Sequence, residues 1–227
     1  GMYYLTMDSD RNKDNPLPIA NAYELEHALF SGKITDHDNI LYRYVVNKAD
    51  GTSEIKKVVT TPGRVRVYNI LPEVLKENGF DLVNKTMKKT DVSDLIDAEY
   101  RFAGTKETCD FSDRLMQLGF KEAAKSGVSV GKDDMVIPTS KEERISKSSE
   151  KVKNIDRQYR EGLITVGERY NKIIDEWSIC GDDIQKDMMK QISKGTNPED
   201  KNSMYIMVDS GARGSKSQLQ QMCGMRG

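Results

Sequence analysis

The sequence predicts an α+β fold that is mainly α-helical, with a small antiparallel β portion and a protruding antiparallel helical hairpin. Two observations predict this class. From residue 83 onward, apolar side chains recur mostly at helical spacing. Only 40–60 is rich in the β-branched and aromatic residues that favour strands. We therefore expect a small β portion, centred on one hairpin of strands, in a mainly helical chain.

The charge balance limits the functions that the composition allows. The 227 residues include 36 acidic and 35 basic side chains, for a formal charge of −1. Binding of nucleic acid through bulk positive charge is therefore excluded, and any phosphate contact must come from a few placed cations. The sequence has no apolar stretch of membrane-spanning length and no signal-like start, so we expect a cytoplasmic protein without membrane contact.

The cysteines and histidines do not form a recognisable ligand pattern. Three widely spaced cysteines lack a Cys-x-x-Cys pair, and only two histidines are present. We predict neither a disulfide scaffold nor a structural zinc site from this spacing. Cys180 is expected to be a small core residue.

The N-terminal residues are expected to contain a short strand, a loop and a helix. Residues 3–5 have the apolar character of a short buried strand, and 8–18 is polar and proline-bearing, as loops are. Asn21 begins a capping box for an amphipathic helix over 22–31, which Gly32 ends.

The strand signal follows at 41–46 and 55–60. An Asp-Gly pair at 50–51 between these segments favours the tight turn of a β-hairpin. A Thr-Pro pair at 61–62 then has the form of a helix start. The following segment, 64–71, is ambiguous between helix and strand by periodicity alone.

Two helices are predicted next. Asp91 is expected to cap the first, and Gly104 to end it. Thr105 opens the second, which ends at Gly127. Each has one apolar face, formed by Val92, Leu95, Ile96 and Tyr100 in the first and by Phe111, Leu115, Leu118 and Ala123 in the second.

Residues 141–194 predict a long antiparallel helical hairpin. A thin apolar seam at heptad-like spacing crosses the highly charged stretch 141–160, and Thr165 begins a second capping box and a second seam. So narrow a seam predicts that the hairpin projects into solvent from a larger body. The seam residues are Ile145, Val152, Ile155, Tyr159, Val166, Tyr170, Ile173, Trp177, Cys180 and Ile184.

Two adjacent acidic pairs are interpreted without catalysis. Asp182 and Asp183 would point about 100° apart on a helix, so we interpret them as solvated surface charge. Asp133 and Asp134 lie in a predicted loop, where their carboxylates are expected to bind nearby amides.

The tail places an arginine in a glycine-flanked loop. Between 201 and 227 four cations accompany one acid, Asp209, so the segment carries 4 − 1 = +3. A Gly-x-Arg-Gly loop at 211–214 that leads into a helix would offer backbone amides and the Arg213 guanidinium to phosphate oxygens. It lacks the Gly-Lys-Ser/Thr ending of a Walker loop. A plain left-handed glycine turn remains the alternative interpretation.

At this tail the sequence resembles a known family. NSMYIMVDSGARGSKSQLQQMCGMRG resembles the segment of the bacterial DNA-directed RNA polymerase β′ subunit that leads from its rim helices into the F-loop. GLITVGERYNKIIDEW looks like the turn and second helix of the rim hairpin, and TTPGRVRVYNILP and GMYYLT look like pore-domain stretches. The matches run in the family's order along the whole chain, with 7–60 weakly matched.

The resemblance implies a pore-like domain over 1–138 and a funnel-like domain over 139–227. The rim hairpin would occupy 141–194, and the start of the F-loop segment 202–227. The family's catalytic pattern, NADFDGD, does not occur in this sequence. We therefore expect a fragment of a nucleotidyltransferase that is inactive alone, with no catalytic residue and no metal site. Magnesium and zinc are expected only in the full subunit.

The resemblance also implies roles for individual residues in the secondary channel, which admits nucleoside triphosphates in this family. Arg213 would meet triphosphate oxygens. Four more residues would line the channel or contact the F-loop: Met207, Gln221, Met225 and Arg226. Arg157 and Arg160 would belong to a docking site for regulators.

The implied partners are those of a transcription enzyme. They are the β, α and ω subunits, the rest of β′, DNA, RNA, nucleoside triphosphates and secondary-channel cleavage factors. Two alternatives stay open: a stand-alone helical-hairpin adaptor that binds protein partners, and a phosphate-binding protein built on 211–214. A Met-rich tail exposed in isolation would favour the fragment over the adaptor.

Overall fold

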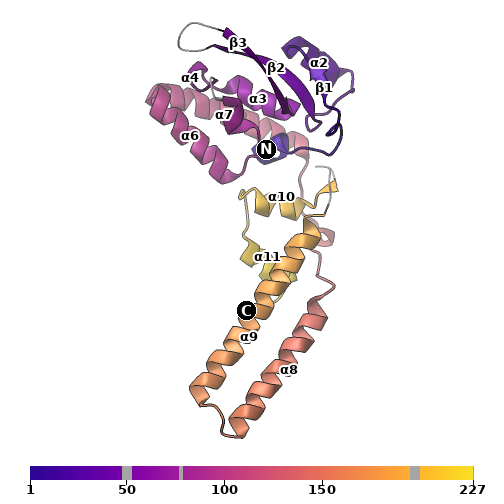
Figure 1. The fold of residues 1–227 in the computed structure, drawn as a ribbon, viewed down its shortest axis with the longest axis vertical. Coiled ribbons are helices and arrows are strands. Elements are labelled where there is room, and N and C mark those ends of the chain that lie inside the picture. Colours follow the sequence, from indigo (N-terminus) through magenta and orange to yellow (C-terminus); the bar gives the residue numbers. More distant parts are fainter. Residues whose placement is uncertain (48–52, 77–78, 195–199, 227) are drawn as a thin grey trace. The chain divides into compact units, whose positions relative to one another are not determined.

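The computed structural model describes residues 1–47, 53–76, 79–194 and 200–226 (Figure 1). They form two compact units, each of which is described by itself. The first unit contains Gly1–Ser129, 200–201 and Asp209–Ala212. The second contains Val130–Lys194, Asn202–Val208 and 213–226. The predicted class, mainly α with a small β portion, is confirmed.

The first unit is built from short helices around a small sheet. Its helices are α1 (Met2–Thr6), α2 (Ala22–Phe30), α3 (Pro62–Ile70), α4 (Glu73–Lys76), α5 (Gly79–Val83), α6 (Lys89–Ala103) and α7 (Thr105–Ser126). Its strands are β1 (Leu17–Ile19), β2 (Ile40–Asn47) and β3 (Ser53–Thr60). The predicted helix over 22–31 is confirmed, and the ambiguous 64–71 is largely helical, within α3.

The sheet is mixed, with the strand order β1-β2-β3. β2 and β3 form the predicted antiparallel pair, whereas β1 pairs with β2 in parallel. This parallel strand was predicted as loop, because it is three residues long and has Pro18 at its centre. The expected Asp-Gly turn lies outside the described residues.

An aromatic cluster joins one face of the sheet to the helices. Tyr44 meets Tyr68 of α3 edge to face with ring centroids 5.6 Å apart, and Tyr68 stacks on Phe80 of α5 at 4.1 Å. Burial raises the pKa of Tyr68 to about 12, and its hydroxyl donates to the Lys76 carbonyl at 3.3 Å. The cluster therefore fixes α3, α4 and α5 against β2.

Residues 3–5 lie in α1, so the predicted strand is wrong. Tyr3 and Leu5 are buried as expected, because α1 packs on α3 and α7. Five residues are too few for an apolar periodicity to distinguish helix from strand. Tertiary contacts, described next, determine the conformation.

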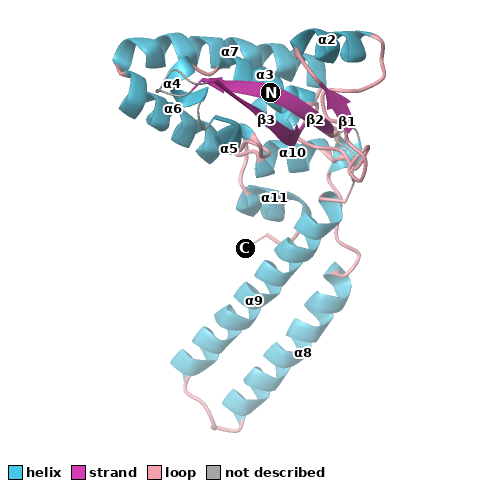
Figure 2. Ribbon diagram, turned by 45° about the horizontal axis from the view of Figure 1, so that its top comes forward, coloured by secondary structure: helices cyan, strands magenta, loops and turns pink. Residues whose placement is uncertain are grey.

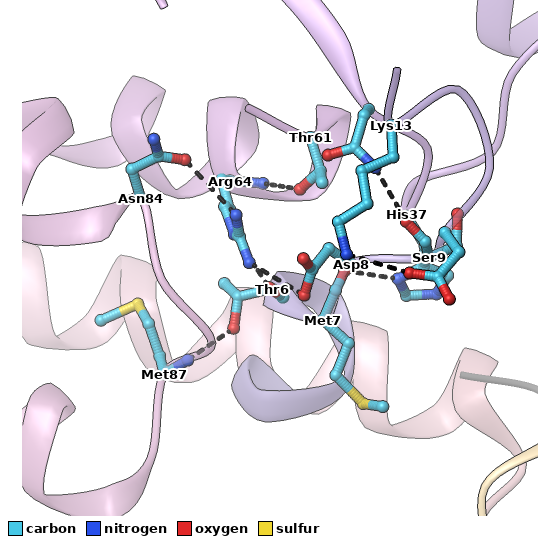
Figure 3. A network of polar contacts seen from close by, with 12 residues as sticks. Thr6, Met7, Asp8, Ser9, Lys13, His37, Thr61, Arg64, Asn84 and Met87 are labelled. Atoms are coloured by element: carbon cyan, nitrogen blue, oxygen red, sulfur yellow. Dashed lines mark hydrogen bonds and ion pairs between the residues drawn. The ribbon is translucent and has the colours of Figure 1, made fainter. Parts of the chain in front are cut away.

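Thr6 is the centre of a buried polar network that connects three distant segments (Figure 3). Its hydroxyl donates to the Met2 carbonyl and accepts from the Met87 amide, both at 2.8 Å. Its carbonyl accepts from Arg64 Nε at 3.0 Å. The Arg64 guanidinium also reaches Asn84 and Asp8, at 3.4 Å each. Residues near 6, 64 and 87 are thereby held together.

The long helices α6 and α7 have the predicted extent except at the start of α6, but Tyr100 and Ala123, predicted on their apolar faces, are exposed. Asp91 is not the N-cap of α6 but its third residue, where its carboxylate accepts from the Lys88 amide at 2.9 Å. The pKa of Asp91 is lowered by hydrogen bonds from Lys85 and the Lys88 amide. Gly104, with φ 81°, separates the two helices as predicted.

The second unit contains a long helical hairpin (Figure 2). Its two antiparallel helices are α8 (Lys141–Arg160) and α9 (Val166–Ile192). Two short helices, α10 (Ser203–Asp209) and α11 (Lys216–Cys223), follow, and α11 packs on α9. The loop before α8 contains a 3₁₀ turn at Lys132–Asp134, where Asp134 accepts from the Gly131 amide at 2.7 Å, as predicted for this acidic pair.

We predict that Thr6→Val lowers the free energy of unfolding of the first unit by about 1–3 kcal/mol, because the buried Met87 amide loses its acceptor. Hydrogen exchange of peptides within 1–129, followed by mass spectrometry in increasing urea, measures the change. Thr90→Val, at an exposed position of α6, is the matched control and should change the value by less than about 0.5 kcal/mol. Equal values for the two variants would contradict the role of Thr6.

Candidate functional site

Arg213 lies in the turn between α10 and α11, within the second unit. Its amide donates to the Met207 carbonyl at 3.3 Å, which closes the turn onto α10. Gly214 follows with φ 82°, a conformation that side chains other than glycine rarely adopt. The Arg213 side chain is exposed, so its guanidinium is available to a ligand.

The start of α11 offers fewer amides than the sequence predicts. Ser215 and Gln218 form a reciprocal capping box, in which each side chain accepts from the other's backbone amide, at 3.0 and 3.2 Å. Together with the Arg213 amide, three donors near the loop are thus already used. Recognition of an anion here depends on side-chain cations more than on the helix terminus.

A groove of about 620 Å³ opens beside this turn. Four of the five residues predicted for the channel lie in its wall: Arg213, Met207, Gln221 and Arg226. The remaining lining residues are Met204, Val208, Gly214, Ser215, Gln218, Leu219 and Met222. The structure therefore brings together residues that are 19 positions apart in the sequence (226 − 207).

The groove combines two cations with an apolar wall. Arg213 and Arg226 are exposed, and no carboxylate lies among its lining residues. Within the described part of the chain, neither guanidinium forms an ion pair. Methionine thioethers from α10 and α11 provide the apolar surface. Such a groove suits an anion with a flat or apolar body.

Behind the groove, α11 is anchored on a small core. Met188, Ile192, Leu219 and Cys223 are buried there against each other. Burial raises the pKa of the Cys223 thiol, so this cysteine stays neutral and unreactive at physiological pH. Cys180 of α9 is also buried, as predicted.

Met225 does not line the Arg213 groove. It lies with Ile174, Trp177, Gly181 and Arg226 in a neighbouring hollow of about 640 Å³ between α9 and α11. The sequence could not predict in which hollow Met225 lies, because a shift of one residue changes the side of the backbone that a side chain faces. Arg226 lines both hollows.

The turn of the hairpin has a fixed backbone and an exposed surface. Gly162 has φ 77°, and Thr165 and Glu168 form the predicted capping box, in which Glu168 accepts from the Thr165 amide at 2.8 Å. Arg157 and Arg160, in the last turn of α8, are exposed, and Arg157 donates to Asn154 at 2.6 Å. Leu163, Val166 and Tyr170 are each more than 60% exposed, with values of 69%, 64% and 65%.

These exposures correct the predicted seam. Val166 and Tyr170 do not pack between the helices, although their spacing continues that of Cys180 and Ile184. Near the turn, an ion pair between Arg169 and Asp156 at 2.7 Å joins α9 to α8 instead, and the Arg169 guanidinium also covers the Tyr159 ring. In this half of the hairpin, polar contacts therefore add to the half-buried seam residues Val152, Ile155 and Ile173.

Further polar contacts cross the hairpin at two more levels. Glu176 accepts from Ser148 and Lys151, both at 2.9 Å. Arg144 contacts Asp187 at 2.7 Å and Asp183 at 3.0 Å. Asp183 is therefore a surface charge that is paired with Arg144, with 38% of its side chain exposed, and Asp182 is exposed as expected. Opposite charges on two predicted helices were the available signal, but helix periodicity alone does not pair them.

The described residues do not fit a metal centre. In the ranges that the structure describes, no group of three or more His, Cys, Asp or Glu side chains gathers closely enough to hold an ion. The magnesium and zinc expected for a full subunit have no ligand set among these described residues. Among the described helices, none is both long enough and apolar enough to cross a membrane.

Comparison with known proteins identifies relatives along the whole chain. The family model "RNA polymerase Rpb1, domain 3" matches residues 1–135, and "RNA polymerase Rpb1, domain 4" matches 164–227. The DNA-directed RNA polymerase subunit β′ of Anaplasma phagocytophilum is 44% identical over 228 aligned residues, and that of Anaplasma marginale 43%. Both alignments cover all of this chain but only 16% of the relative's length.

We predict that acid weakens the hairpin partly through Asp187. Hydrogen bonds from Arg144 and Ser140 lower the pKa of Asp187. A carboxyl whose pKa is lower in the folded state stabilises the fold above its unfolded pKa of about 3.9, and this contribution disappears as the pH falls through the folded value. Asp187→Asn should therefore flatten the dependence of stability on pH below about 5 and cost about 0.5 kcal/mol at neutral pH.

Urea unfolding followed by the fluorescence of Trp177, the single tryptophan, measures this effect within the hairpin. Asp182→Asn is the control, since this neighbouring carboxyl is exposed. An unchanged acid profile in Asp187→Asn would show that the contact with Arg144 contributes nothing to stability.

Proposed function

We propose a function for this chain from the premise that it belongs to the RNA polymerase β′ (Rpb1) family. In this proposal the Arg213 groove lines the secondary channel through which nucleoside triphosphates reach the active centre during transcription. The rest of a β′ subunit, of which the chain matches 16% in the relatives, would supply the catalytic carboxylates. The chain alone is then inactive.

The groove is the observation that carries this proposal. A nucleoside triphosphate is a polyanion with a flat aromatic base. The groove offers two exposed guanidinium groups, which form no ion pair with any described residue, beside methionine side chains. Guanidinium groups bind phosphate oxygens through paired hydrogen bonds. A cation at the wall of a channel also raises the local concentration of an anionic substrate. Arg213 would thus attract and orient the triphosphate without taking part in chemistry.

The other groove residues would support this role in different ways. Met207 would give the nucleobase an apolar contact, and Gln221 would offer amide hydrogen bonds to a sugar or phosphate. Arg226 would add a second cation. Met225, which lies in the neighbouring hollow, is proposed instead to pack against the F-loop and bridge helix of the whole subunit.

The hairpin is proposed to be a docking site for secondary-channel cleavage factors. Its turn joins exposed apolar side chains, Leu163, Val166 and Tyr170, to the exposed cations Arg157 and Arg160. Apolar contact area with charges around it is typical of transient protein interfaces, in which the charges accelerate association. A partner with an acidic surface would match this turn.

The remaining partners follow from the same premise. We propose that the β, α and ω subunits and the rest of β′ surround this chain in a cytoplasmic polymerase that binds DNA and RNA. Of the four tail methionines predicted to be exposed, Met222 is 60% exposed, whereas Met204, Met207 and Met225 are half-buried. The stand-alone adaptor is less well supported because the family models and relatives that the chain matches are those of RNA polymerase.

We predict that Arg213→Ala, in an assembled polymerase, raises the apparent KM for nucleotides about five-fold without impairing assembly. The estimate takes about 1 kcal/mol for one solvent-exposed contact between a guanidinium and a phosphate. Single-nucleotide addition at limiting substrate measures it. Lys216→Ala is the matched control, because Lys216 is exposed three residues away but does not line the groove. Identical kinetics in the two variants would remove the role of Arg213.

We predict that Arg157→Glu combined with Arg160→Glu reduces cleavage-factor stimulation of transcript cleavage by roughly ten-fold at low salt. Reversal of two charges at an interface slows association, and high salt should narrow the difference. Lys106→Glu, at an exposed position of α7, serves as the control. Undiminished stimulation in the double variant would place the docking site elsewhere.

A further inference from the structure

The sheet of the first unit has an uncovered edge. β1 pairs with β2 only from Ile40 to Tyr42, because β1 ends at Ile19 and Asn21 begins α2. From Arg43 to Val46, no described strand lies on this side of β2. Every second residue of such an edge directs its backbone N–H and C=O groups outward, where another chain can bind them.

A hollow of about 450 Å³ lies along this edge. Its end is formed by Ala20, whose carbonyl accepts from Arg43 Nε at 3.3 Å. Tyr44, Tyr68 and Lys76 also line it, together with Val45 of the edge itself. Val46 is buried, so the accessible stretch is Arg43–Val45, about 10 Å long. The hollow therefore follows the path that β1 would take if it continued.

The outward face beside the hollow is both apolar and basic. Val45 and its cross-strand neighbour Ile55 are 55% and 63% exposed. Arg43 stands directly opposite Lys57 on β3, and both side chains are exposed. Two like charges in this arrangement repel each other. Among the described side chains, no carboxylate forms an ion pair with either cation.

From this geometry we propose that an extended acidic segment of another polypeptide adds to β2 as a further strand, in the path that β1 leaves open. Its backbone would bind the outward groups of Arg43–Val45. On the outward face, one of its side chains would contact Val45 and Ile55, and a carboxylate two positions along the segment would bind Arg43 and relieve its repulsion from Lys57. The segment would continue the position of β1 beside β2.

The edge favours a peptide over a nucleic acid. Donors and acceptors that alternate along a strand match a peptide backbone, whereas phosphates offer acceptors only. The hollow also contains a carboxylate, Glu73, whose side chain is 75% exposed and would repel carboxylates and phosphates alike. A peptide can place an uncharged side chain beside it, whereas each nucleotide carries a phosphate. One cation of the hollow, Lys76, is already paired with Glu73 at 2.6 Å. The site differs from the Arg213 groove and does not depend on its function.

Amide resonances of this chain, labelled with ¹⁵N, report the binding directly. The probe is a blocked pentapeptide, Thr-Glu-Thr-Val-Thr, whose Glu and Val side chains share one face, added in increasing amounts. We expect saturable shifts that are confined to residues 43–45 and their neighbours in the hollow. A peptide with proline at its centre, Thr-Glu-Pro-Val-Thr, disrupts pairing along the edge and should bind at least five-fold more weakly. The lysine peptide, Thr-Lys-Thr-Val-Thr, should not bind.

Arg43→Glu tests the charge requirement without loss of the sheet, because the new carboxylate faces Lys57. This variant should bind the glutamate peptide about ten-fold more weakly and gain affinity for the lysine peptide. Lys121→Glu, exposed on α7, should behave as the parent chain. Shifts that are absent or lie elsewhere, equal binding of both charged peptides, or equal shifts from a thymidine pentanucleotide would each overturn the proposal.

Discussion

The backbone of α1 is the fixed point around which the first unit is assembled. At Gly63, a Cβ atom would stand 2.0 Å from the Leu5 carbonyl, so α3 can approach α1 this closely only with glycine at its second position. One residue on, Arg64 binds the Thr6 carbonyl, and the Thr6 hydroxyl holds the amide of Met87 just before α6. A helix of five residues thus receives contacts from segments about 60 and 80 positions away.

The second unit is stabilised differently, because a hairpin of two helices can bury little apolar surface. Near α11, apolar side chains such as Ile184 and Met188 form a small core. Toward the turn, ion pairs at Glu176 and Asp156 take over. Partly exposed pairs stabilise a fold weakly, but they need a defined partner and so specify how the two helices align. Apolar side chains near the turn, such as Val166 and Tyr170, are exposed on the surface.

The sequence predicted most of the long helices and their ends, because capping residues and glycines act locally. Asn21, Thr165 and Gly104 are examples, and each has the predicted role. The missed elements include α1 and β1, whose few residues take their conformation from distant contacts such as those of Thr6. The short helices α4, α5 and α10 were not predicted either.

At the candidate site, sequence patterns predicted which residues come together better than they predicted the contacts of those residues. Gly214 predicted the turn that exposes Arg213. The capping box that uses the nearby amides was not predicted, because the role of Gln218 in it depends on where α11 begins. Val166 and Tyr170 have seam spacing and still lie outside, because periodicity gives the face of a helix and not the distance to its partner. The open edge of β2 is invisible in a sequence that does not reveal β1.

The closed turn of the hairpin has a consequence for recognition. Gly162 in its left-handed conformation and the reciprocal bonds of Thr165 and Glu168 leave the chain between α8 and α9 few alternative conformations. A protein that binds this turn would meet a rigid surface, so most of the conformational entropy lost on association would be lost by that protein. Which proteins bind would then depend on how well their surface fits the shape of the turn. Even weak complexes with it can form and dissociate rapidly.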